Sequence, residues 1–189
     1  MKRGTSKPNV WRLVTAHRAT YVDADGRPRW QDFVLLDGVP LASIGLTLLL
    51  GVELKRPLAV GLLTVSGLLA GLLFGVMLQV SARALDWAES APNPSRETSR
   101  HAQYLQELSA NAGYASLVCV LAAIVYVIAG VSSGVVLSIS SAFGIGLGLH
   151  LVLSLFMVMK RVFLLTTERL NRARTGSGLE GQRDRRRAS

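Results

Sequence analysis

Residues 67–75 read GLLAGLLFG and lie within segment 57–79, which carries no charged side chain. In a water-soluble helix, each interior glycine costs about 1 kcal/mol relative to alanine. In lipid, helices associate through small residues that allow their backbones to approach closely. The stretch therefore predicts a transmembrane helix whose packing face is formed by Gly67, Gly71 and Gly75.

The composition fits a membrane protein with segregated charge. Half of the 189 residues are hydrophobic and the mean hydropathy is +0.36, although the chain carries 21 lysines and arginines. Most charged residues cluster in 1–32, 53–56, 83–107 and 160–187, and the apolar runs between them are long enough to cross about 30 Å of hydrocarbon. The single cysteine excludes a disulfide within the chain and a metal site built from thiolates. We therefore predict an all-α membrane protein.

Four apolar runs predict four transmembrane helices arranged as two hairpins. The first hairpin joins runs 38–53 and 57–80, and the second joins runs 113–131 and 135–159 through a VSSG turn. At the start of the first run, Asp37 is predicted to be the helix N-cap, with a proline three residues later in the first turn.

Between the hairpins, we predict a cytosolic helical hairpin. The second helix can continue to about Ser90, PNPS then breaks it, and a new helix starts at Arg96. Five regions follow from this reading: a basic cytosolic N-terminal arm (1–32), the first transmembrane hairpin (33–80), the cytosolic helical connector (81–112), the second transmembrane hairpin (113–160), and a basic helical extension with a disordered tail (161–189).

The distribution of basic residues predicts the orientation in the membrane. Nineteen of the 21 lysines and arginines lie in the N-terminal arm, the connector and the C-terminal tail, and two lie in the 53–56 loop. Cytoplasmic loops carry an excess of Lys and Arg. Both termini are therefore expected in the cytoplasm of a multipass protein of the bacterial inner (plasma) membrane.

The fourth helix carries small and polar residues that favour two interpretations. A histidine deep in a membrane helix is a candidate functional residue, so a pore-lining stripe is predicted at Ser141, Gly146, His150 and Ser154. The alternative is a neutral histidine bonded to a neighbouring serine or carbonyl. Gly144 and Gly148 form a second predicted packing face with Ser140. Both glycine faces could pack helices within one subunit or join subunits of a homo-oligomer.

The N-terminal arm interleaves basic and aromatic residues. This pattern can grip phosphates and stack bases, so an anionic ligand is predicted to bind Arg12, Arg18, Arg27, Arg29 and Trp30. The same residues could instead lie on anionic lipid headgroups.

No phosphate-binding glycine loop, nucleophile elbow or HExxH motif occurs, and the three histidines lie in separate regions. We therefore expect neither an enzyme, nor a cofactor, nor a metal site.

The strings YVDADGRPRWQDFVLL and GLLAGLLFG, with the close first hairpin and the helical segment that follows, resemble known proteins over residues 10–112. They are similar to small membrane effectors of nucleotide-controlled bacterial antiphage systems, in particular the channel subunit of the Hailong type. This resemblance implies an oligomeric ion channel held closed by an oligonucleotide or cyclic nucleotide ligand that a partner nucleotidyltransferase makes. It transfers no functional residue.

The resulting hypothesis is a homo-oligomeric ion channel in membrane lipid, gated from the cytosol. One alternative is a non-conducting membrane adaptor that recruits an acidic partner or anionic lipid. A second alternative is a holin-like lysis protein. Conductance separates the channel from the adaptor, and closure by a ligand separates it from a holin.

Overall fold

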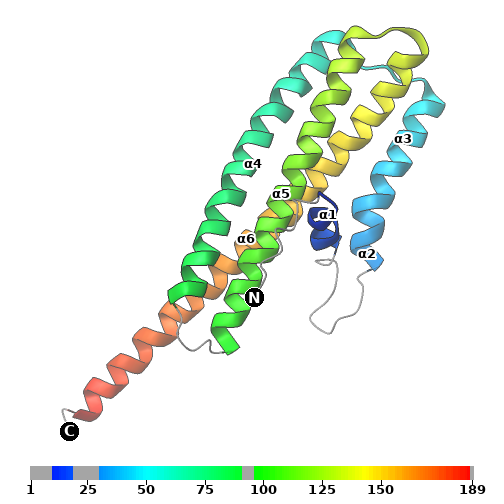
Figure 1. Cartoon of the computed structure of the whole chain (residues 1–189). Helices are drawn as coiled ribbons and strands as arrows, with labels where there is room; N and C mark the ends of the chain where they lie inside the picture. Colours follow the sequence, from blue (N-terminus) through cyan, green and yellow to red (C-terminus); the bar gives the residue numbers. More distant parts are fainter. Residues whose placement is uncertain (1–9, 19–29, 91–95, 188–189) are drawn as a thin grey trace.

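The structure is a computed structural model that describes residues 10–18, 30–90 and 96–187. Within these ranges the chain is helical and contains no strand, which confirms the all-α prediction. The elements in chain order are α1 (Val10–Arg18), α2 (Trp30–Phe33), the π-helical turn η2 (Val34–Gly38), α3 (Val39–Leu50), α4 (Arg56–Ser90), α5 (Arg96–Val131) and α6 (Gly134–Arg187) (Figure 1).

Three helices are long and apolar enough to cross a membrane. These segments are Arg56–Asp86 in α4, Tyr104–Val131 in α5 and Gly134–Lys160 in α6. The fourth apolar segment, Val34–Leu50, is shorter and reaches about 25 Å at 1.5 Å per residue. The hydrocarbon layer is about 30 Å thick. A membrane protein with three long apolar helices is therefore supported, and a complete fourth crossing stays a prediction.

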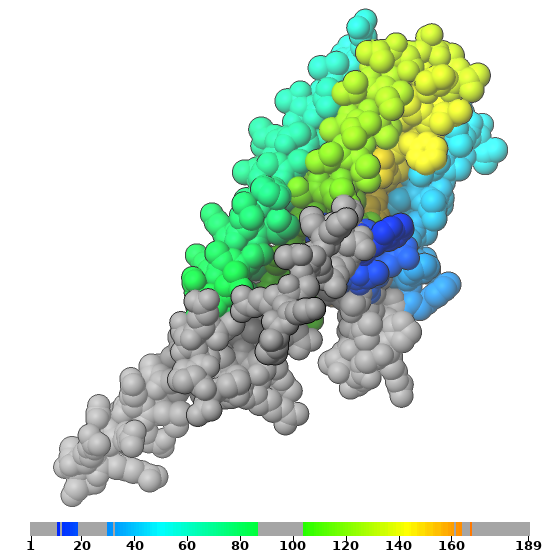
Figure 2. Space-filling view, in the orientation of Figure 1, coloured from blue at the N-terminus to red at the C-terminus, as the bar shows by residue number. Residues whose placement is uncertain are grey.

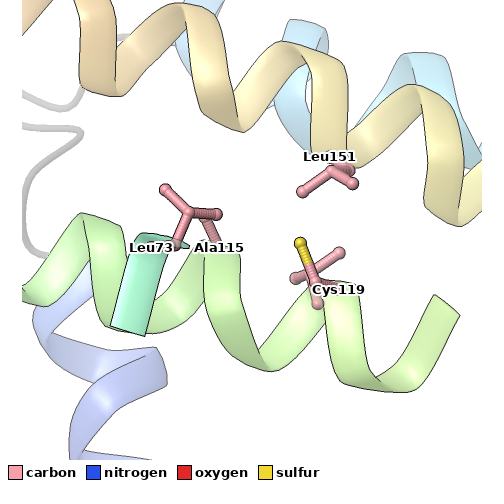
Figure 3. Close-up of a cluster of buried hydrophobic side chains, with 5 residues drawn as sticks. Leu73, Ala115, Cys119 and Leu151 are labelled. Atoms are coloured by element: carbon pink, nitrogen blue, oxygen red, sulfur yellow. The ribbon is translucent and has the colours of Figure 1, made fainter. Parts of the chain in front are cut away.

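The long helices pack in the order α4, α5, α6, α3 (Figure 1). The predicted pairing of the first two runs as a close hairpin is not confirmed, because α3 packs along α6 while α4 packs along α5. At the centre of the row, Cys119 of α5 points its sulfur towards Leu151 of α6, with Leu73 of α4 alongside (Figure 3). We call the end with the α3–α4 and α5–α6 turns the turn end, and the opposite end the basic end; α1 lies part-way along the bundle, next to the start of α2 and η2 (Figure 1).

Helices α4 and α5 stay paired where their apolar segments approach the basic end, and each helix continues for several residues past its segment. Helix α4 ends at Ser90 and α5 begins at Arg96, as the sequence predicts. The Ser81 and Ser109 hydroxyls lie 2.7 Å apart across the pair, and Leu105 and Leu108 of α5 are buried. The connector is therefore largely a continuation of two membrane helices. Its position in the cytosol stays a prediction.

Two local predictions differ from the structure. Asp37 is not an N-cap, because the helical path already begins at Trp30 and Asp37 lies inside η2. The C-terminal region, predicted to be disordered beyond about residue 175, continues as helix α6 to Arg187. The end of α3 needs a glycine: Gly51 has φ of +62°, and its neighbour's N–H bonds back to the Thr47 carbonyl.

Candidate functional site

The site begins with a proline inside a helix. Pro40 has no N–H, so it cannot donate to the Leu36 carbonyl four residues earlier, and its ring crowds that carbonyl. The chain widens here into the π-turn η2. The Leu36 oxygen instead accepts a 2.6 Å hydrogen bond from Nδ1 of His150 on α6. A carbonyl that Pro40 cannot pair with is thus bonded by a residue of α6.

His150 joins α6 to α5 as well as to η2. Because a carbonyl can only accept, Nδ1 carries a proton and donates this bond. Its Nε2 lies 2.9 Å from the Tyr114 hydroxyl on α5, at hydrogen-bond distance. The histidine is 7% exposed and both ring nitrogens are bonded. This geometry agrees with the alternative interpretation in that the histidine bonds to a carbonyl.

Tyr114 also contacts the N-terminal helix. The ring of His17 on α1 stacks on the Tyr114 ring at a centroid distance of 3.8 Å and an angle of 10°. Nδ1 of His17 lies 2.7 Å from Oδ1 of Asn111, one turn before Tyr114. Both His17 and Asn111 are 1% exposed. We call His17, Asn111, Tyr114, His150 and the Leu36 carbonyl the polar chain, since it links α1, α5, α6 and η2.

Helix α1 is also held by close packing. A Cβ on Gly113 of α5 would lie 3.0 Å from Leu13 of α1 and 2.7 Å from Met77 of α4, so this glycine lets three helices meet. Beside this contact, Arg18 and Asp37 form an ion pair of 3.7 Å. The Arg18 side chain is 62% exposed, and exposed pairs of this kind contribute roughly 0–1 kcal/mol. Packing and the polar chain therefore dominate the docking of α1. Figure 2 shows the atoms of α1, in dark blue, beside the lighter blue atoms of the segment that leads into α3.

The predicted pore-lining stripe lies inside the chain, mostly beneath α3 and its flanking turns. A Cβ on Gly146 would collide with Ile44 and approach the Pro40 carbonyl. The hydroxyl of Ser141 accepts a 2.9 Å hydrogen bond from the backbone N–H of Leu54, just after α3. Ser154 is 2% exposed, and its hydroxyl has no hydrogen-bond partner in the described part of the chain. As described, the stripe is closed to solvent and lipid.

The predicted ligand-binding residues are described only in part. Arg27 and Arg29 lie outside the described residues, as does the side chain of Arg12. Arg18 pairs with Asp37, and Trp30 is 73% exposed. On α1, Trp11 is 71% exposed as well. Two exposed tryptophans near the start of the bundle are typical of a membrane–water interface.

The two predicted packing faces have different surroundings. In α6, a Cβ on Gly144 or Gly148 would lie 2.9 Å or 2.7 Å from Tyr126 of α5, whose hydroxyl donates to the Gly144 carbonyl. Between them, α5 and α6 fill this face within the chain. In α4, no described atom lies within 4 Å of a Cβ built on any of the three stripe glycines, Gly67, Gly71 and Gly75.

Sequence reasoning found His150 but missed His17, Asn111 and Tyr114. The sequence analysis assigned the segments around these three residues by their overall charge and hydrophobicity. It could not pair the residues, because their partners are 36 to 94 positions away in the chain. One signal was present: a proline four residues after an apolar position leaves a carbonyl that requires a buried donor. Only the fold shows that His150 supplies it.

No protein-family model, curated protein or solved structure matches the chain.

Proposed function

We propose that the chain is a homo-oligomeric ion-conducting membrane protein that is gated from its basic end. One observation carries the proposal: the polar stripe of α6 lies beneath the short helix α3 and its flanking turns, at Gly146, His150 and Ser141. Polar and ionisable groups within a membrane bundle are costly and mark ion pathways by default. The structure then corresponds to a closed state, in which α3 covers the path.

Helix α3 has the properties of a movable cover. It is 12 residues long, is preceded by the π-turn η2 and ends at the left-handed Gly51. Several of its side chains are exposed, with Leu49 at 86% and Leu41 at 67%. By contrast, α4 and α5 pack along each other over most of their length. Movement of α3 away from α6 would therefore expose the stripe while the α4–α5 pair stays intact.

Assembly would use the glycine face of α4. This helix lies at one end of the row, and no described atom lies within 4 Å of a Cβ built on Gly67, Gly71 or Gly75. Lipid tails need no groove, whereas small residues spaced four apart allow close helix–helix contact. A second copy is the occupant that such a face favours. Contact of α4 with a different surface of the next copy closes a ring, which is the symmetry a channel requires.

The signal that acts on the basic end would be anionic. Arg18 is exposed and only weakly paired, so a phosphate-bearing ligand can compete with Asp37 for its guanidinium. An oligonucleotide or cyclic nucleotide from a partner nucleotidyltransferase fits this chemistry and the resemblance to antiphage effectors. An anionic lipid headgroup is the competing source of the same charge.

A reversible cross-link tests whether α3 is the cover. In a Cys119→Ala background, Ile44→Cys with Gly146→Cys would tether α3 to α6, since a Cβ at position 146 adjoins the Ile44 side chain. The matched control is Ser81→Cys with Ser109→Cys, which tethers the α4–α5 pair at hydroxyls 2.7 Å apart. The readout is ion flux through the purified protein in liposomes.

We expect the α3–α6 tether to abolish flux and a reductant to restore it, while the α4–α5 tether leaves flux within about twofold of the unlinked protein. Equal flux through the tethered and reduced α3–α6 forms would show that the stripe is not the path. If the unlinked protein forms an oligomer but conducts nothing with any ligand added, the adaptor function replaces the channel.

A further inference from the structure

We propose that α1 is a latch that holds the α3 cover closed, and that Tyr114 transmits its state. The proposal rests on the proposed function for its purpose, but the contacts it concerns exist whether or not the chain conducts. Four elements meet in the polar chain: α1 through His17, α5 through Tyr114, α6 through His150, and η2 through the Leu36 carbonyl. Because η2 leads directly into α3, the chain ends at the base of the cover.

Tyr114 is suited to transmit the state of α1 to His150, because its ring and its hydroxyl contact different residues. The face of its ring stacks on His17, whereas its hydroxyl bonds to His150. If His17 moved away, the Tyr114 ring would lose the side chain stacked on its face, and its hydroxyl could move away from His150 Nε2. His150 would then hold the Leu36 carbonyl less firmly, although no contact between α1 and α3 themselves had changed.

The latch has two states because α1 is short. It has 9 residues, and isolated helices below about 12–15 residues are marginal in water. Its helical structure therefore depends on docking, so release and unfolding of α1 occur together. A two-state element of this kind, biased from one side by a ligand and from the other by the bundle, is what a coupling between two sites requires.

A ligand at the exposed side of α1 could shift this equilibrium. Arg18 lies next to His17 in the chain and is 62% exposed, while His17 is 1% exposed. A ligand that binds Arg18 only while α1 is folded on the bundle would favour the docked state, in which His17 stacks on Tyr114, and would so keep the cover closed. The ion pair itself contributes little. Arg18 is therefore the residue that the ligand binds, and His17 is the residue that attaches α1 to Tyr114.

Amide hydrogen exchange of the full chain in lipid nanodiscs measures both ends of the proposed route. His17→Ala should accelerate exchange at least tenfold in residues 10–18 and, through Tyr114, severalfold in residues 34–38. Tyr114→Phe keeps the ring and removes the hydroxyl. It should accelerate exchange only in 34–38 and leave 10–18 within about twofold. In the double variant, 34–38 should exchange no faster than in Tyr114→Phe alone.

Two further variants keep the test decisive. Thr15→Pro breaks α1 at an exposed position and changes no residue of α5 or α6. It should therefore reproduce the effect of His17→Ala even where the histidine substitution itself disturbs the bundle. Arg18→Gln controls for the direct link to Asp37 and should change 34–38 by less than twofold. Unchanged exchange in 56–85 verifies that each variant is folded.

Two results would overturn the proposal: loss of α1 without any change in 34–38, or additive effects of His17→Ala and Tyr114→Phe. A larger effect of Arg18→Gln than of Tyr114→Phe would do the same, since it would route the coupling through the ion pair. None of these measurements involves ion flux, so a failed latch and a failed channel give different results.

Discussion

At the residue scale, a single missing N–H explains much of the site. Pro40 leaves the Leu36 carbonyl without a helical donor, and His150 supplies one from another helix at 2.6 Å. The widened turn also places Asp37 beside Arg18 rather than at a helix start. The proline therefore sets the register of η2, the position of its carboxylate and the direction of the histidine.

Replacement of the proline should undo this register. In Pro40→Ala, the new N–H competes with His150 for the Leu36 carbonyl and favours an ordinary α-helical turn. The register change rotates Asp37 by roughly 100° about the helix axis. We expect slower exchange within 34–38, measured in nanodiscs, and exchange in 10–18 that stays within about twofold, because the exposed Arg18–Asp37 pair contributes little. Pro57→Ala is the control. Pro57 lies in the first turn of α4, where a backbone N–H would have no acceptor within the helix. Identical profiles for the two variants would contradict this explanation.

A second residue-scale prediction concerns the glycine beneath α1. In Gly113→Val, branched atoms enter the space that Leu13 and Met77 now fill, at 3.0 Å and 2.7 Å from a Cβ. Met77 is flexible and can move, but α1 is held too weakly to resist. We expect exchange in residues 10–18 to rise at least tenfold. Gly130→Val in the same helix has no described atom within 4 Å of its Cβ and should leave α1 protected. Equal protection in both variants would rule out Gly113 as the docking point.

At the scale of elements, the sequence predicts helix ends well and helix partners poorly. Ser90 and Arg96 are recognised because PNPS must interrupt a helix between them. The partner of α3 is not recognisable from its own residues: its contacts with α6 join positions about a hundred residues apart, such as Ile44 with Gly146. Charge patterns similarly identify a basic arm but not the histidine by which it docks.

The turn end of α3 provides a prediction about stability. The N–H of Leu54 donates to the Ser141 hydroxyl, and both residues are buried. Ser141→Ala leaves this N–H without its partner, which costs about 1–3 kcal/mol. We expect the free energy of unfolding, measured with denaturant in detergent, to fall by that amount. Ser138→Ala, whose hydroxyl bonds to the exposed Glu53, should cost less than half as much. A larger loss from Ser138→Ala would show that the Leu54 contact is not the main anchor.

At the scale of the whole molecule, the row of helices has two unlike ends. One end is the glycine face of α4, and the other is α3, with its exposed leucines. Sequence alone identified the glycine face but left open whether it packs within a subunit or between subunits. Its three glycines meet no described atom of the same chain, which favours contact between copies.

Substitution within this face tests the assembly. Gly71→Leu places a bulky side chain where close backbone contact is proposed, and we expect at least a tenfold loss of oligomer in nanodiscs, measured by native mass spectrometry. Gly45→Leu is the matched control, because Gly45 of α3 is also exposed and also has no described atom within 4 Å of its Cβ. An oligomer that tolerates Gly71→Leu would place the interface elsewhere.

The central claim is that this assembly conducts ions under control from its basic end. Ion flux through the verified oligomer in liposomes tests it most directly, with short oligonucleotides or anionic lipid supplied on the side of α1. The account predicts flux that one of these anions suppresses, and suppression that Arg18→Gln weakens at least severalfold. An intact oligomer that passes no ions under any of these conditions would contradict it.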